Sequence, residues 1–378
     1  MTEVVDERRI SWPILVGLFF IAVFLGGGIG MIVFSSCMFL SQSRFAVDKD
    51  GKHGIARSGV SRLGGVAILF GVIFYWAIQD HFKSNFLFLT DYGQTSFLFE
   101  MAICSLLIAS IGFFDDFKQI MPPLLKISLM FFLSVLGFWM FGEMQLSRSP
   151  IQMVNGYFAF PAFSLVCSSF VLIGFANAGN VVDGANGLLS LIACFFFGVA
   201  FYETSEMDYL LIFLAVAVFA VINLTWGQII LGDFGAYWIS AMIVLCSFRL
   251  FNELNTSIWF FASILSYPCF EIVRITIYRI FSKKSPLVAD NSHLHNSFYA
   301  YIKGKVPSAN GANSITGTLL ALLSCGVPTF AIFIGNQSTT SSEWFSLWAF
   351  QIGLFAVLTF LFGSYGFFGT RSNLELDC

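Results

Sequence analysis

The sequence has few charged residues and no excess of basic ones. Asp, Glu, Lys and Arg make up 11% of the 378 residues, and the formal net charge is -3, whereas a soluble domain carries roughly 25% charged residues. This balance does not indicate a nucleic-acid partner. None of the eight cysteines forms a Cys-x-x-Cys pair, and all but Cys378 lie in apolar runs, so neither structural zinc nor a disulfide framework is predicted.

Hydrophobic residues, in contrast, make up 57% of the chain, and 48 residues are Phe. A chain this apolar predicts an all-α, polytopic integral membrane protein. We interpret residues 1–378 as a single transmembrane domain, since no soluble domain or repeat is visible. About eleven apolar runs have lengths near those needed to cross ~30 Å of hydrocarbon. They are 13–40, 63–79, 97–114, 122–141, 158–176, 188–202, 209–225, 236–251, 258–278, 314–335 and 344–366.

Lys and Arg residues gather in the loops that follow odd-numbered spans, which predicts that these loops are cytoplasmic. Arg8 and Arg9, beside the first span, favour the opposite orientation. The twelve on the first side are Arg44, Lys49, Lys52, Arg57, Arg62, Lys118, Arg279, Lys283, Lys284, Lys303, Lys305 and Arg371, against Arg8, Arg9, Lys83 and Arg148. The polar segments 41–62, 115–121, 177–187, 226–235 and 280–313 all fall on that side. We therefore expect the polar chemistry at the cytoplasmic face, with 280–313 as a long loop.

The segment from Asn177 to Gly187 places three amides and one carboxylate between two apolar runs. These side chains are Asn177, Asn180, Asp183 and Asn186. Polar groups at a membrane boundary are costly unless they bind something, so this segment is predicted to form part of a site.

Acidic residues mark two further segments. Asp115 and Asp116 are adjacent at the end of a span, and Asp233 lies between Gly232 and Gly235. Two neighbouring carboxylates repel unless a cation or a proton neutralises one of them, and oxygen ligands of this kind suit Mg²⁺. A solvated helix end, or a simple turn at Asp233, would have the same sequence.

The basic residues and histidines can each be interpreted in more than one way. His293 and His295 could bind metal, hydrogen-bond phosphate or be solvated, and Arg62 suits either a phosphate contact or an ordinary cytoplasmic loop. Lys126 lies just inside a span, where it either holds an anion or extends to the interface. Glu271 and Arg274, three residues apart within a span, are either functional or a satisfied structural pair.

Taken in order, these residues resemble a known family. It is the polyprenyl-phosphate N-acetylhexosamine-1-phosphate transferases of glycosyltransferase family 4, related to phospho-N-acetylmuramoyl-pentapeptide transferase. The resemblance covers about residues 44–300 and rests on Arg62, Gly64, Gly65, Asp115, Asp116, Pro122, Pro123, Lys126, Asn177, Asn180, Asp183, Gly184, Asn186, Gly187, Gly232, Asp233, Gly235, Pro268, Glu271, Arg274, Ser285, Pro286, Asp290, His293 and His295. The spacing from Arg62 back to His53 departs from the family pattern, which leaves the role of His53 open. Asn296 replaces a further histidine found in the pentapeptide transferase, which favours a simple amino sugar as substrate.

The resemblance implies an Mg²⁺-dependent enzyme (Mn²⁺ is the alternative ion) that transfers a sugar-1-phosphate from a UDP-sugar to polyprenyl phosphate and releases UMP. It implies catalytic, metal-binding roles for Asp233, Asp115 and Asp116. Substrate binding is implied for Lys126, Asn177, Asn180, Asp183, Asn186, Arg62, His293 and His295. A bacterial inner membrane location, surface polysaccharide or O-antigen synthesis and a homodimer are also expected.

A secondary transporter of an anionic solute is the alternative. Its support is the number of spans together with Lys126, Glu271 and Arg274 inside them. Transporters place their sites near the middle of the bilayer and often contain inverted repeats. Here the polar residues are predicted at one surface, so the enzyme is the preferred hypothesis.

Overall fold

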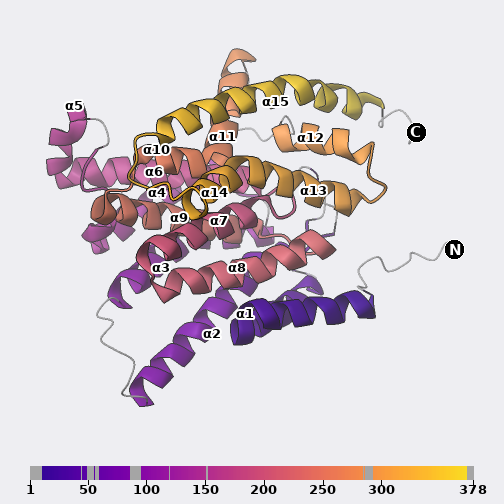
Figure 1. The fold of residues 1–378 in the computed structure, drawn as a ribbon, viewed down its shortest axis with the longest axis horizontal. Coiled ribbons are helices and arrows are strands. Elements are labelled where there is room, and N and C mark those ends of the chain that lie inside the picture. The colour runs from indigo at the N-terminus through magenta and orange to yellow at the C-terminus, as the bar shows by residue number, and fades with distance from the viewer. Residues whose placement is uncertain are drawn as a thin grey trace.

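The computed structural model describes residues 11–43, 45–48, 55, 59–85, 95–118, 120–149, 152–283, 285 and 293–372. Helices make up most of this part of the chain, which otherwise contains isolated β-bridges but no strand. The predicted all-α membrane fold is confirmed. In Figure 1 the helices lie side by side, from indigo α1 at one edge of the bundle to yellow α15 at the opposite edge.

Every predicted span overlaps one to three successive helical segments. The α-helices are α1 (Trp12–Ser41), α2 (Gly64–Asn85), α3 (Thr95–Lys118), α4 (Pro123–Met140), α5 (Gln152–Asn155), α6 (Pro161–Val182), α7 (Leu188–Thr204), α8 (Met207–Trp226), α9 (Gly232–Leu254), α10 (Ile258–Ile264), α11 (Ser266–Phe281), α12 (Leu294–Lys303), α13 (Ala309–Ala321), α14 (Val327–Phe333) and α15 (Trp344–Ser372). By length and composition, seven helical segments in the described residues can cross a membrane, or eight if α10 and α11, bent by 79°, form one span. A count of eleven is not confirmed.

Helix α9 forms the centre of the bundle. The apolar window of this helix is completely buried, and α9 packs against α2, α3 and α6. Its contact with α3 is close, because a Cβ added at Gly112 would lie 2.4 Å from the backbone carbon of Asp233. A glycine is needed on α3 at this point to let the two backbones approach.

A small bridged segment fixes the beginning of α9 relative to α2. Ser61 forms bridges with Val47 and Ile229, and the N–H groups of Gly64 and Gly65 donate to the carbonyl oxygens of Ile230 and Leu231 at 2.9 and 3.1 Å. Backbone groups of the loop before α2 are thereby paired with the chain that leads into α9. This pairing sets the positions of Arg62 and Asp233 relative to each other.

Two polar segments differ from the sequence prediction. Residues 280–313 are not one loop, because they include α12 and the first turn of α13. Asp233 is not in a loop but in the first turn of α9, since that helix begins at Gly232, four residues before the predicted span. Gly232 has a φ of 73°, which permits the sharp entry into the helix.

The end of α9 remote from Asp233 carries a charged cluster that the sequence analysis missed. Arg249, 7% exposed, donates two hydrogen bonds to Glu206 at 2.6 and 2.7 Å and one to Glu253 at 3.0 Å. Tyr209 accepts a further bond at 3.2 Å. The guanidinium is therefore satisfied by paired carboxylates, which explains how a charge is accommodated in a buried helix.

Candidate active site

Four separate segments bring acidic and basic side chains together at the beginning of α9. Arg62 precedes α2, Asp115 and Asp116 end α3, Lys126 lies in the first turn of α4, and Asp233 begins α9. Arg62 Nη2 lies 2.7 Å from Asp233 Oδ1, and its Nε lies 3.1 Å from Asp116 Oδ1. Lys126 Nζ lies 2.5 Å from Asp115 Oδ2 and 2.9 Å from Asp233 Oδ2. These five side chains form the acid–base cluster.

Asp116 and Asp183 cap the N-terminus of α9. The Asp116 carboxylate accepts the backbone N–H groups of Asp233 and Phe234, both at 2.9 Å, and Gly232 donates a backbone hydrogen bond to Asp183. The first N–H groups of a helix have no partner within the helix, and its N-terminal dipole favours negative charge. The sequence predicted that a cation or a proton neutralises one of the two adjacent acids. In the structure, Asp116 is stabilised by the helix N-terminus as well as by Arg62.

When all of its carboxyl groups are ionised, the cluster carries a surplus of negative charge. Counting Asp183 with the three other aspartates, four carboxylates face the two cations Arg62 and Lys126. Burial opposes the charge of Arg62, but the carboxylates of Asp233 and Asp116 outweigh it and raise its pKa. Burial and the charges of Asp233 and Asp116 raise the pKa of Asp183 well above the ordinary aspartate value. The site is thus unfavourable for a further negative charge unless positive charge is added.

The segment from Asn177 to Gly187 is held by amides from two other helices. Asn313 Oδ1 accepts the Asn186 N–H at 2.9 Å, Asn310 Oδ1 accepts from Asn186 Nδ2 at 2.8 Å, and Asn223 Oδ1 accepts the Gly187 N–H at 2.6 Å. Asn186 is 5% exposed. These contacts give Asn186 a clear role in fixing the loop that follows Asp183.

The two other amides of that segment lie on α6. Asn177 Nδ2 donates to the carbonyl oxygen of Ile173 at 2.8 Å, one turn earlier. Asn180, in the last turn, is partly buried. The predicted substrate-binding amides therefore differ in their surroundings, and only the last of them, Asn186, is bound to distant helices by the contacts described above.

His293 and His295 are organised by α11. Glu271 is fully buried; its Oε1 lies 3.0 Å from His293 Nδ1 and accepts the Leu294 N–H at 3.2 Å. Arg274 Nη2 donates to the same oxygen at 2.6 Å. The pair Glu271–Arg274 is thus more than a satisfied structural pair, because it also holds the N-terminus of α12 and the ring of His293.

The ring of His295 lies parallel to that of His293, with centroids 5.2 Å apart and 4° between the planes. Its Nδ1 lies 3.3 Å from the hydroxyl oxygen of Tyr267. Burial and the nearby charge of His293 lower the pKa of His295 to about 3. His295 is therefore neutral at pH 7. Contacts among the described residues do not join this pair to the acid–base cluster.

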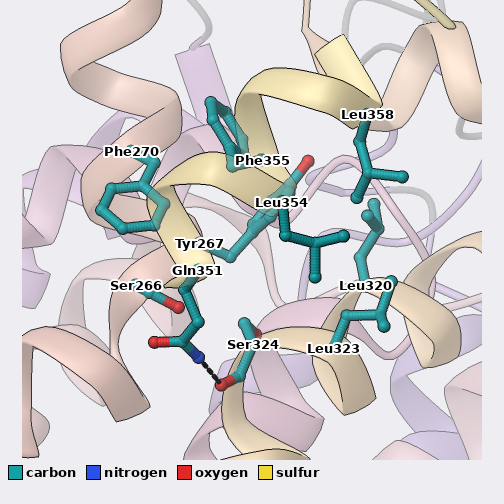
Figure 2. Close-up of a pocket in the computed structure, with 10 residues that line it drawn as sticks. All are labelled: Ser266, Tyr267, Phe270, Leu320, Leu323, Ser324, Gln351, Leu354, Phe355 and Leu358. Atoms are coloured by element: carbon teal, nitrogen blue, oxygen red, sulfur yellow. Dashed lines mark hydrogen bonds between the residues drawn. The ribbon is translucent and has the colours of Figure 1, made fainter. Parts of the chain in front are cut away.

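An apolar cavity of about 30 Å³ lies between α11, α13 and α15 (Figure 2). It is lined by Tyr267, Leu320, Phe355 and Gln351, whose Nε2 donates to the Ser324 carbonyl oxygen at 2.7 Å. The space suits about one water molecule. Its size and lining do not fit a phosphorylated substrate, so the acid–base cluster, and not this cavity, is the candidate for the reaction.

Several residues at the site were not singled out from the sequence. Asn223 was missed because an amide inside an apolar helix resembles an ordinary packing residue, and Asn310 and Asn313 were missed because they were counted only as part of the polar segment 280–313. Asp48 was also missed; it is fully buried, and its charge contributes to the raised pKa of Arg62. Asn310 and Asn313 lie just before a predicted span, and polar residues in that position could have indicated a contact with the site. His53 and Asp290 lie outside the described residues.

The donors at the cluster fit a hard divalent cation. Carboxylate oxygens are the ligands that Mg²⁺ prefers, and the charge surplus favours a doubly charged ion. Within the described ranges, no three His, Cys, Asp or Glu side chains are already grouped as a metal site. The oxygens of Asp115 and Asp233 instead face Lys126 and Arg62.

The structure is a multi-pass helical bundle, and its acidic, cation-paired site lies at the N-terminus of the buried helix α9. This arrangement is suited to a membrane protein that binds charged groups. Residues 98–251 match the family model of glycosyl transferase family 4. This segment contains Asp115, Asp116, Lys126, Asp183 and Asp233, so the resemblance to this family is confirmed for the part of the chain that carries these residues.

The chain is also similar to curated phospho-N-acetylmuramoyl-pentapeptide-transferases. It is 29% identical over 223 residues to that of Streptococcus pneumoniae serotype 2, covering 54% of this chain and 64% of the relative. It is 28% identical over 218 residues to that of Streptococcus equi subsp. zooepidemicus and over 224 residues to that of Streptococcus agalactiae serotype III, with the same coverage. The chain thus spans slightly less than two thirds of the length of these relatives.

Proposed function

We propose that this protein transfers a sugar-1-phosphate from a UDP-sugar to polyprenyl phosphate. The observation that carries the proposal is the convergence of Arg62, Lys126, Asp115 and Asp233 at the N-terminus of α9. Transfer between two phosphorylated reactants requires positive charge and accurate positioning more than covalent help from the protein. The family match and the curated relatives support the same reaction class.

In the proposed reaction, a phosphate oxygen of the lipid forms a bond to the β-phosphorus of the donor. The bond from that phosphorus to the bridging oxygen breaks, and UMP leaves with the electron pair. Mg²⁺ or Mn²⁺, held by Asp115 and Asp233, would supply positive charge to the diphosphate. Lys126 would bind the lipid phosphate, and Arg62 would hold Asp233 in place. Asp116 keeps its predicted importance here through the cap of α9.

The remaining predicted residues are proposed to bind the donor. Asp183, Asn177, Asn180 and Asn186 would line the nucleotide side. His293 would contact the sugar-phosphate, with His295 holding the ring of His293 by stacking.

For the donor, we propose a simple UDP-N-acetylhexosamine, as used in surface polysaccharide or O-antigen synthesis, because Asn296 follows His295. The names of the curated relatives favour a second candidate, UDP-N-acetylmuramoyl-pentapeptide. We place the site at the cytoplasmic face of the bacterial inner membrane, in line with the distribution of Lys and Arg. The comparisons lend no support to a transporter or to a homodimer.

The test is UMP release by the full chain in detergent, with polyprenyl phosphate and Mg²⁺. We expect release with a UDP-N-acetylhexosamine that depends on both the lipid and the ion. Release with the muramoyl-pentapeptide donor alone would replace the first substrate by the second. Asp233→Asn is expected to abolish turnover, and undiminished activity of this variant would refute its role. Uptake of solute into proteoliposomes without UMP formation would favour the transporter.

A further inference from the structure

Lys126 bridges two carboxylates that come from different helices. Its ammonium contacts Asp115 Oδ2 at 2.5 Å and Asp233 Oδ2 at 2.9 Å, while the two aspartates are 7% and 2% exposed. Two buried carboxylates that contact the same ammonium repel each other unless a cation lies between them. Lys126 therefore neutralises the two carboxylates, as a bound cation would.

The other carboxylate oxygens of the cluster are already committed. Asp233 Oδ1 faces Arg62 at 2.7 Å, and Asp115 Oδ1 accepts the Met121 N–H at 3.1 Å. Both oxygens of Asp116 accept backbone N–H groups of α9. The two oxygens that Lys126 contacts are therefore those through which a divalent ion reaches both Asp115 and Asp233 without displacing Arg62 or the Met121 N–H.

We propose that Lys126 and a divalent cation are alternative occupants of this one position. Arrival of the ion displaces the ammonium, which swings on its flexible four-carbon stem and becomes available to an anionic phosphate. The protein thus keeps its carboxylates neutralised before the ion binds and gains a free positive charge afterwards. The inference deepens the proposed function, because the phosphate that Lys126 then meets is that of the lipid substrate.

The first test is binding of Mn²⁺ to the full-length protein in detergent, measured by electron paramagnetic resonance without substrates. We expect Lys126→Gln to bind Mn²⁺ at least ~10-fold more tightly than the unmodified protein, since a competing charge at contact distance is removed. Lys118→Gln is the matched control; it removes one charge from the exposed end of α3 and is expected to change affinity by less than about twofold. Unchanged or weaker binding by Lys126→Gln overturns the proposal.

A second test requires no variant. Reductive methylation of the unmodified protein, followed by mass spectrometry, reports how accessible and basic each lysine amine is. We expect labelling of Lys126 to rise when Mg²⁺ is added without substrate, while labelling of Lys118 stays constant. Equal labelling of Lys126 with and without Mg²⁺ overturns the competition. Both tests measure ion binding without turnover, so their outcome is separate from that of the UMP assay.

Discussion

Asp116 accepts the backbone N–H of Asp233 at 2.9 Å, although 117 residues separate them in the sequence. The same carboxylate accepts the next N–H, that of Phe234. The pair joins the C-terminal end of α3 to the N-terminal end of α9. The position of Asp233 is thereby set by Asp116 as well as by the paired segment that leads into α9. Asp116 holds the helix, whereas Asp115 contacts Lys126, so the two adjacent aspartates have different roles.

Asp116→Asn is expected to destabilise the fold more than Asp115→Asn. An amide at position 116 turns one acceptor into a donor that faces a backbone N–H, which costs about 1–3 kcal/mol for an unsatisfied buried group. Asp115→Asn loses the contact with Lys126 but leaves the cap intact. Thermal unfolding in detergent measures the difference. Both variants should lose UMP release, and equal unfolding temperatures would contradict the separation of roles.

Gly112→Ala is expected to reduce turnover by about 10²-fold, because a shift of about 1 Å at a catalytic group has that effect. Its new methyl group would lie 2.4 Å from the Asp233 backbone carbon and push α9 away from α3. Gly174→Ala on α6 is the matched control, since a Cβ there meets nothing within 4 Å. UMP release by the two variants decides the point; equal rates would mean that the close approach of α3 and α9 does not position Asp233.

Much of this architecture was predictable, since apolar runs report helices directly. The sequence also marks Asp115, Asp116, Asp183 and Asp233 as unusual, because acids at span ends are costly. Sequence patterns could not predict hydrogen bonds between residues that are far apart in the chain. The cap by Asp116 and the clamp on Asn186 depend on three-dimensional proximity that no local spacing encodes. Arg249 was missed for a similar reason, because Glu206, which accepts two of its hydrogen bonds, lies 43 residues earlier in the chain.

Asn313→Leu is expected to weaken donor binding, while Asn313→Asp preserves it. The Asn313 Oδ1 atom accepts the Asn186 N–H at 2.9 Å, and aspartate retains an acceptor at that position whereas leucine does not. Loss of the acceptor leaves a buried N–H unpaired and loosens the loop after Asp183. We expect KM for the UDP-sugar to rise about 10-fold in the leucine variant with a smaller change in kcat. Equal KM values in the two variants would show that the clamp does not act on binding.

Glu271→Gln is expected to raise KM for the UDP-sugar by about 10-fold, because the neutral amide weakens the hydrogen bonds made by the carboxylate, and a hydrogen bond to a charged group contributes about 1.5–3 kcal/mol. The glutamate Oε1 holds His293 Nδ1 and the first N–H of α12. Glu253→Gln serves as the control. It makes the same chemical change in the ion pair with Arg249, at the end of α9 remote from Asp233. A KM that moves equally in both variants would indicate a general structural effect.

His295 is expected to make stability depend on pH below neutrality. Burial and the charge of His293 hold its pKa at about 3, whereas an exposed histidine has a pKa of about 6.5. Between about pH 6.5 and pH 3, His295 is therefore protonated in the unfolded chain and neutral in the folded chain. This contribution to stability is complete above about pH 6.5 and is lost progressively as the pH falls towards 3. Tyr267, His293, Glu271 and Arg274 face the ring or act on it, and all four remain in the variant His295→Gln. The unfolding temperature should fall between pH 7 and pH 5, and the fall should be larger for the unmodified protein than for the variant. An equal fall in both would show that His295 titrates normally.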